Sequence, residues 1–385
     1  MLLSSSPAGI FKQIPFCCQI SCRLFYMLLT FVFSFQLYAQ PPLKLVKRID
    51  EAVYQYHQID FEKYPGFVIG VIDNDSVYFF SYGKSSEDSL RLPEKNDLFE
   101  IGEVTQVFTA LLTEKLILQG KFSQDSKVVS LVQSLNNCGF DSLITIQQLL
   151  RHSSGVPKIP DNLGNNQSQD NPYQGYSILD FKSFICERAT SDAGMKDKYR
   201  FSQVGYALLS AVIQDISHIR LDKILQDEIF KPLNMTRSGL EGNLTGDTLV
   251  RGFTAGGTPA FPWDTNIFQG ALGMESTAGD LIQFLRIMLQ QEPSLLVKAF
   301  NSTLKPVMET GMDKRSHVAE GWHVYKIKKN YDICLAAGHT GGHSAFIGLV
   351  RETRTGVVIL ANTENGLSHL GLSVLEILNY KWKRK

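Results

Sequence analysis

Two stretches of the chain place a lysine three residues after a serine, at Ser81 with Lys84 and at Ser302 with Lys305. On a helix, residues three apart share a face, so the lysine amine could take the proton of a nucleophilic serine. Neither run leads into an amphipathic helix. Ser81 also follows an expected strand, where residues three apart point to opposite faces. We therefore reject both pairs as catalytic groups.

Four other stretches carry polar residues at the edges of expected helices and strands. Residues 97–110 read Asp-Leu-Phe-Glu-Ile-Gly-Glu-Val-Thr-Gln-Val-Phe-Thr-Ala and lead into an expected helix. Residues 149–157 read Leu-Leu-Arg-His-Ser-Ser-Gly-Val-Pro. Residues 199–209 begin Tyr-Arg-Phe-Ser-Gln-Val-Gly-Tyr, and residues 338–342 read Gly-His-Thr-Gly-Gly.

In their order and spacing, these stretches resemble the motifs of the serine β-lactamase and penicillin-binding protein superfamily, in its class C-related branch. Weaker matches at residues 232–235 and 273–281 extend the resemblance over roughly residues 45–363. The resemblance implies an α/β fold in which a predominantly antiparallel sheet is built from both chain ends and flanked by helices. It also implies an inserted all-helical domain and a cleft between the two parts.

The resemblance makes Glu103, Gln106, Phe201, Gln203 and His339 the family's catalytic positions, and the first four are substituted. Glu103 stands where the family has its serine nucleophile, and Gln106 where it has the lysine. Phe201 replaces a tyrosine that passes protons, and Gln203 replaces an asparagine that positions substrate. Phenylalanine has no exchangeable proton, so that shuttle is lost. Removing such groups costs several powers of ten in rate.

The fourth motif, Gly-His-Thr-Gly-Gly at residues 338–342, has no substitution relative to the family pattern. By resemblance, its strand aligns substrate like an added strand, with Thr340, Gly341 and Gly342 binding substrate and His339 facing the carboxylate side. Active relatives are β-lactamases, D-Ala-D-Ala carboxypeptidases, peptidases and esterases that need no metal or cofactor. His152, taken alone, is typical of a satisfied buried histidine rather than a catalyst.

These substitutions favour a catalytically inactive homologue that binds a peptide, a cell-wall fragment or a partner protein in its cleft. A helix N-terminus stabilises Glu103 as the anion, which weakens it as base and nucleophile and lets it occupy the oxyanion hole. Thr105 is rejected as a nucleophile because we expect it inside the helix turn. The alternative is an active hydrolase in which Glu103, beside the apolar Phe201, or another group activates water. A decaying paralogue without a ligand is a third interpretation.

The spacing of apolar residues predicts the elements that position these groups. Asp73-Asn74-Asp75 between two apolar runs is a hairpin signal. Residues 104–290 are expected to be mainly helical, with a polar loop at 161–170. The other expected elements are a helix over 45–56, strands over 67–72, 76–80, 333–336, 344–350 and 356–361, and a final helix over 367–378.

The composition and the N-terminal segment indicate which partners and which cellular location to expect. Lys+Arg and Asp+Glu balance at 38 each, so no net charge draws the chain to nucleic acid or anionic lipid. Residues 1–39 are predicted to be a signal peptide, because Lys12 and Arg23 precede an apolar run over 24–33 and Ala39 suits a cleavage site. We expect residues 40–385 to be exported to the periplasm or the medium, with no further membrane insertion. An uncleaved anchor is the alternative.

Three of the six cysteines lie in the predicted signal peptide. Cys138, Cys186 and Cys334 are odd in number, widely spaced and set among apolar residues. They match neither a disulfide framework nor a zinc site. We therefore expect three buried thiols.

Overall fold

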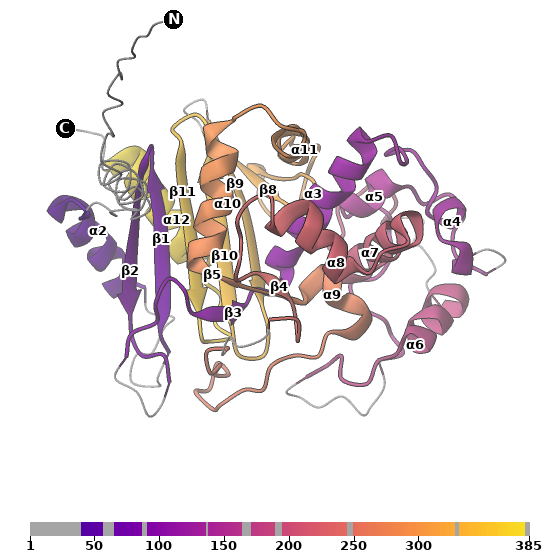
Figure 1. The fold of residues 1–385 in the computed structure, drawn as a ribbon, viewed down its shortest axis with the longest axis horizontal. Coiled ribbons are helices and arrows are strands. Elements are labelled where there is room, and N and C mark those ends of the chain that lie inside the picture. Colours follow the sequence, from indigo (N-terminus) through magenta and orange to yellow (C-terminus); the bar gives the residue numbers. More distant parts are fainter. Residues whose placement is uncertain are drawn as a thin grey trace, which may run out of the picture. The chain divides into compact units, whose positions relative to one another are not determined.

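Strands from both ends of the chain meet in one eight-stranded antiparallel sheet, as the sequence predicts (Figure 1). The β1–β2 hairpin turns at Asn74, and β1 pairs on its other side with β11, near the C-terminus. The strands, in spatial order, are β2 (Ser76–Tyr82), β1 (Phe67–Asp73), β11 (Thr355–Ala361), β10 (Ser344–Val350), β9 (Tyr331–His339), β8 (His323–Ile327), β7 (Ser316–Val318) and β6 (Met308–Glu309).

The computed structural model describes residues 40–56, 65–86, 91–135, 138–163, 171–188, 195–244, 249–327 and 331–381. The predicted signal peptide, residues 1–39, lies outside these residues and stays a prediction. Within the described ranges, no helix combines the length and the apolar run needed to cross a membrane.

The two faces of the sheet bury alternate residues against different helices. Phe67, Ile69 and Val71 of β1 belong to a core shared with α2 (Leu43–Tyr54) and α12 (Ser368–Glu376), which the turn η8 (Ile377–Lys381) extends. Val68 and Ile72 point the other way into the main core. There α10 (Ala278–Gln290) packs on β1 and β11. The sheet is thus covered on both sides.

A mainly helical stretch separates the N-terminal strands from the C-terminal ones, as predicted. It also contains short strands: β5 (Met274–Thr277) pairs with β4 (Gly239–Leu240) and with β3 (Leu98–Glu100) in a second sheet. The remaining helices and turns are η2 (Gly102–Val104), α3 (Thr105–Leu118), α4 (Val128–Leu131), η3 (Gln133–Leu135), α5 (Ile146–Leu150), α6 (Ile178–Ser183), η4 (Phe184–Arg188), α7 (Gln203–Ser217), α8 (Leu221–Leu225), η6 (Gln226–Phe230), η7 (Asn266–Phe268), α9 (Gln269–Leu272) and α11 (Leu295–Thr303).

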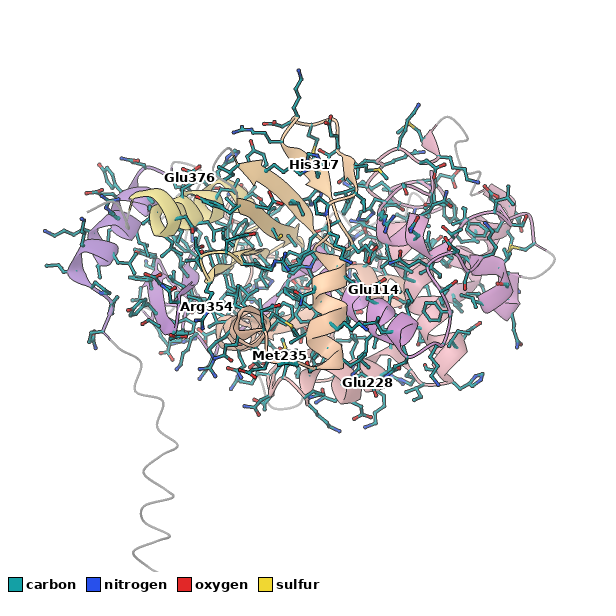
Figure 2. All side chains as sticks on the ribbon, turned by 90° about the horizontal axis from the view of Figure 1, so that it is seen from above. Glu114, Glu228, Met235, His317, Arg354 and Glu376 are labelled. Atoms are coloured by element: carbon teal, nitrogen blue, oxygen red, sulfur yellow. A yellow bond between two sulfur atoms is a disulfide. The ribbon has the colours of Figure 1, made fainter. Side chains whose placement is uncertain are left out.

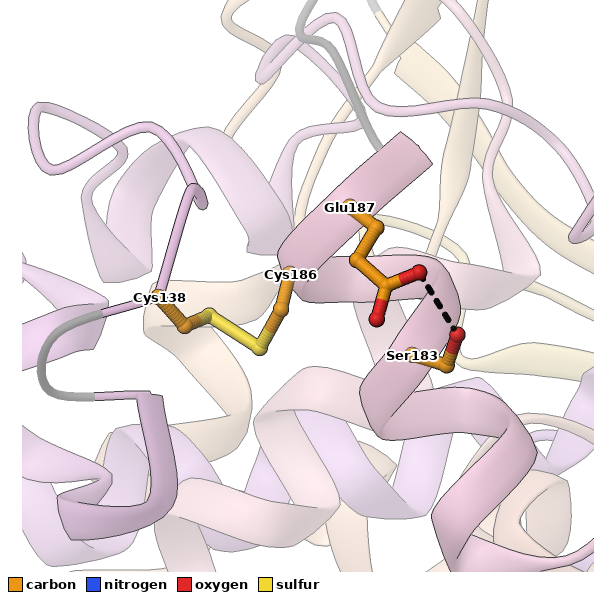
Figure 3. Close-up of a disulfide and its surroundings, with 4 residues drawn as sticks. All are labelled: Cys138, Ser183, Cys186 and Glu187. Carbon is orange, nitrogen blue, oxygen red and sulfur yellow. Dashed lines mark hydrogen bonds between the residues drawn. A yellow bond between two sulfur atoms is a disulfide. The ribbon is translucent and has the colours of Figure 1, made fainter.

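The prediction of three buried thiols is wrong for two of them. Cys138 and Cys186 form a disulfide that joins the loop after η3 to η4 (Figure 3). The backbone N–H of Gly139 also donates to the Cys186 carbonyl, so the two segments already run side by side there. Cys334 is a free buried thiol, as expected, and burial raises its pKa to about 12.

A buried carboxylate network fastens α3 to the turn between β7 and β8. Glu114 of α3 and Glu320 of the turn are 3% and 2% exposed. Gln124 donates its amide to both, at 2.6 Å and 3.1 Å. Arg151 donates Nε and Nη2 to Glu320 Oε1, at 3.2 Å and 3.1 Å. Burial, with Glu114 beside it, raises the pKa of Glu320 to about 8, against the pull of Arg151.

We expect reduction of the Cys138–Cys186 disulfide to destabilise the fold. The bond closes a loop with a sequence separation of 48. Native disulfides typically contribute about 2–4 kcal/mol to the free energy of unfolding. Peptide mapping without reductant should recover the linked pair, and reductant should lower the melting temperature. The Cys138→Ser/Cys186→Ser variant should not respond to reductant, whereas Cys334→Ala should respond as the native chain does. Equal reductant sensitivity in the double serine variant would contradict the assignment.

The Glu320 network predicts a pH dependence with a definite sign. Up to about pH 8 the folded state holds a proton that the unfolded chain releases near pH 4.5. The free energy of unfolding should therefore fall as the pH rises through this window, by on the order of a few kcal/mol. Glu320→Gln cannot ionise and should flatten this slope in urea unfolding. Glu376→Gln, at an exposed site on α12 (Figure 2), should keep it. An unchanged slope in Glu320→Gln would refute the assignment.

Candidate functional site

The site begins where the turn η2, which leads into α3, touches the end of β9. Gly102 has a φ of 50°, and a Cβ there would lie 2.6 Å from the His339 nitrogen. A Cβ on Gly338 would lie 2.4 Å from the Glu103 nitrogen. Only glycine allows two backbones to approach this closely. The contact brings Glu103 and His339, far apart in sequence, to one place.

The Glu103 carboxylate accepts two hydrogen bonds, one from β9 and one from the start of α7. The His339 backbone N–H donates to Oε2 at 3.0 Å, and the Gln203 amide donates to Oε1 at 3.0 Å. The Glu103 side chain is only 10% exposed, whereas the His339 side chain is 54% exposed with its Nδ1 3.9 Å from Oε2. The structure therefore brings together three of the five predicted catalytic positions, and fixes the carboxylate between strand and helix.

Tyr173, which the sequence analysis missed, completes this hydrogen-bond chain. Its hydroxyl donates to Gln203 Oε1, and its ring lies edge-on to Trp263 at 5.5 Å. Burial, together with the charge of Glu103, raises the pKa of Tyr173, so it stays a neutral donor. Tyr173 belongs to no motif and follows a run of polar residues in the sequence, so the sequence holds no signal for it.

The other two predicted positions lie beside this chain but outside it. Gln106 is 3% exposed, and its Nε2 has no hydrogen-bond partner within the described part of the chain. Phe201 packs its ring on His152 at 4.7 Å. Burial lowers the pKa of His152 to about 3, and its Nδ1 accepts the Ser202 backbone N–H at 3.0 Å. His152 is therefore a neutral, satisfied core residue, as expected.

The residues of the 338–342 motif differ in exposure: some lie at the surface and others are buried. The His339 side chain faces outward, whereas Thr340 is buried and donates its hydroxyl to Glu100 Oε2 at 2.8 Å. Gly341 is partly exposed, and the carbonyl of buried Gly342 accepts the Phe253 N–H at 3.2 Å. The substrate-binding role of residues 340–342 stays a prediction, and the Thr340 hydroxyl is already engaged.

Thr105 is the first residue of α3 rather than an inner one, because η2 precedes the helix. It is nevertheless fully buried, and its hydroxyl accepts the Met274 N–H at 3.1 Å, so it is no free nucleophile. Ser302, near the end of α11, donates its hydroxyl back to the Lys298 carbonyl. No group of three or more His, Cys, Asp or Glu side chains in the described ranges is placed to hold a metal ion.

The sequence profile of the β-lactamase family matches residues 56–373, so the chain belongs to that family. It is 24% identical over 322 residues to protein flp of Staphylococcus aureus strain MRSA252. That match covers 80% of this chain and 61% of flp, so the chain spans about three fifths of that relative.

Solved structures share the fold. A β-lactamase/D-alanine carboxypeptidase from Pseudomonas syringae superposes with a TM-score of 0.74 at 15% identity, covering 86% of this chain and 99% of the other. A class C β-lactamase from Rhodobacter sphaeroides gives a TM-score of 0.71 at 18% identity, covering 87% and 98%. The α/β fold with its large antiparallel sheet is thus that of the β-lactamases.

Because η2 and β9 are in close backbone contact, we expect that adding one methyl group at Gly338 lowers the free energy of unfolding substantially. Gly338→Ala would drive its Cβ into the backbone of Glu103 and Ile101, which cannot rotate away. We therefore expect a loss of about 1–3 kcal/mol or more in chemical unfolding. Gly366→Ala is the matched control, because nothing lies within 4 Å of its Cβ. This control should change stability by less than about 0.5 kcal/mol, as surface substitutions usually do. Equal stability of the two variants would show that the backbones do not approach this closely.

Proposed function

We propose that this β-lactamase family member is an exported protein that does not hydrolyse its ligand but binds it beside His339. The observation that carries the proposal is the Glu103 carboxylate at the family's nucleophile position, with hydrogen bonds to both of its oxygens. In active relatives, this part of the site would stabilise the oxyanion that forms during acyl transfer. In this chain, we propose that the Glu103 carboxylate takes the place of that oxyanion.

Acyl transfer by the family's route needs a nucleophile, a base and a proton shuttle. At these three positions the chain has Glu103, Gln106 and Phe201. A neutral amide cannot accept the proton of a nucleophile, and a phenyl ring can neither give nor take one. The loss of all three functions supports binding over turnover.

The ligand class is part of the proposal. A solved relative is named as a β-lactamase/D-alanine carboxypeptidase, which supports a cell-wall peptide for this chain, beside other peptides or a partner protein. The half-exposed imidazole of His339 offers a hydrogen-bonding group to such a ligand. Export is supported by the predicted signal peptide and by the Cys138–Cys186 disulfide, since such bonds persist in oxidising compartments.

A hydrolase that uses Glu103 is the second candidate. The 3.9 Å between Glu103 Oε2 and His339 Nδ1 favours it, because a carboxylate and an imidazole together could activate water. Against it, both oxygens of Glu103 already accept hydrogen bonds. An activated-ester assay separates the two candidates. We expect no turnover above Glu103→Ala, and a rate lost in Glu103→Ala would favour the hydrolase.

The proposal predicts no covalent labelling of the native chain. A fluorescent penicillin should leave it unmodified by intact mass, because no serine stands at position 103. Peptides ending in D-Ala-D-Ala should instead raise the melting temperature without being cleaved. Stoichiometric labelling mapped to any serine would contradict the proposal.

Restoring the family residues should restore acylation. Glu103→Ser alone should give little activity, because Gln106 cannot act as its base. Adding Gln106→Lys supplies an amine one turn on, and adding Phe201→Tyr and Gln203→Asn rebuilds the shuttle and the amide contact. The quadruple variant should form an acyl-enzyme with an activated ester, seen by intact mass. A folded quadruple variant that stays unlabelled would show that the site has changed beyond these four positions.

A further inference from the structure

A pocket lies beside the turn that joins β9 to β10, and Glu103, Gln203 and Phe201 do not line it. Its volume is about 730 Å³. This volume is within the range of small-molecule sites. Gly252 and Gly342, which both line the pocket, are in close backbone contact: a Cβ on Gly252 would lie 2.7 Å from the Gly342 carbonyl oxygen. The Gly342 carbonyl also accepts the Phe253 N–H. The pocket therefore has a fixed backbone base.

The charged side chains that line this pocket are unequal in number. Three arginines, Arg91, Arg237 and Arg251, stand against two carboxylates, Asp97 and Glu100. Both carboxylates already have partners within the protein. Asp97 accepts from Arg91 Nη1 at 2.8 Å and from the Glu94 N–H at 2.8 Å.

Glu100 is more fully engaged than Asp97. It accepts the Trp263 N–H at 2.7 Å and the Thr340 hydroxyl at 2.8 Å, and it contacts His343 Nδ1 at 2.8 Å. The other ring nitrogen of His343 lies 2.9 Å from the Val250 carbonyl oxygen. Both acids of this pocket therefore already have hydrogen-bond donors within the protein.

Unlike the two acids, Arg251 has a side chain that is available to a ligand. Its side chain is exposed, and within the described part of the chain it has neither an ion pair nor a side-chain hydrogen bond. Phe261, on the same pocket, is 67% exposed, with Pro262 and Leu249 adding apolar surface. A guanidinium and an exposed ring that line the same pocket are suited to a carboxylate or phosphate that carries an apolar group.

We infer that this pocket binds a small organic anion, with its carboxylate or phosphate on Arg251 and its apolar part on Phe261. The pocket shares Gly342 with the predicted substrate-binding stretch, but Glu103, Gln203 and His339 do not line it. Gly342 and His343 of the β9–β10 turn line the pocket, so the bound anion would contact that turn. The Thr340 hydroxyl takes no part, because it already donates to Glu100.

The test is calorimetric titration of the full-length protein with four probes: phenyl phosphate, inorganic phosphate, phenylacetate and benzylamine. We expect one or both aromatic anions to bind, with an affinity that falls with added salt, and benzylamine not to bind. Phenyl phosphate and inorganic phosphate without phenylacetate would identify a phosphate site, and phenylacetate would identify a carboxylate site. Binding of benzylamine as tightly as the anions, or no binding of any anion, would overturn the inference.

Variants place the anion in the pocket. Arg251→Gln should weaken binding about tenfold, and Phe261→Ala should weaken the aromatic anions more than inorganic phosphate. Arg220→Gln is the matched control, an exposed arginine outside the pocket that pairs with Asp222, and it should bind as the native chain does. Arg251→Gln should also leave the melting-temperature shift by D-Ala-D-Ala peptides unchanged, which separates this inference from the proposed function. Unchanged anion affinity in Arg251→Gln would overturn the inference.

Discussion

The hydrogen bond from the His339 backbone N–H to the Glu103 carboxylate joins the start of the central helix to the end of the sheet. It requires the two backbones to touch, and so it requires glycine at Gly102 and Gly338. The same carboxylate holds the Gln203 amide, and the amide oxygen in turn orients Tyr173. One substituted side chain thus ties together β9, α3, α7 and the segment before α6. A serine in this position could not reach as many partners.

A second junction lies farther along the same helix. The turn between β7 and β8 packs Gly321 on α3, where a Cβ would lie 2.9 Å from the Gln106 carbonyl oxygen. The neighbouring Glu320 is held by Gln124 and Arg151. Because α3 is almost entirely buried, these junctions fix its position along its length. A helix held in this way is a rigid base for binding, whether or not any chemistry remains.

The elements that the sequence predicts well are those decided by local pattern. The hairpin at Asn74 and the apolar runs of β10 and β11 are recognisable because turn residues and burial act over a few neighbours. The candidate catalytic positions rest on the order of the motifs, and their roles stay predictions. Strands β6 to β8 were missed, since they are only two, three and five residues long.

Contacts between distant segments were the part that could not be predicted. Cys138 and Cys186 have a sequence separation of 48, and spacing alone does not choose a disulfide partner. Tyr173 donates to Gln203 while its ring packs on Trp263 and Phe268, which are both far from it in sequence. The pKa of Glu320 depends on burial beside Glu114, which no local pattern encodes.

The central claim is that the Glu103 carboxylate accepts a hydrogen bond from the His339 backbone N–H at the candidate site. Amide hydrogen exchange at His339, measured by NMR in the native chain and in Glu103→Ala, tests it most directly. We predict slow exchange in the native chain and much faster exchange in the variant, while the amides of β10 stay unchanged. Equal exchange at His339 in both proteins would contradict the account.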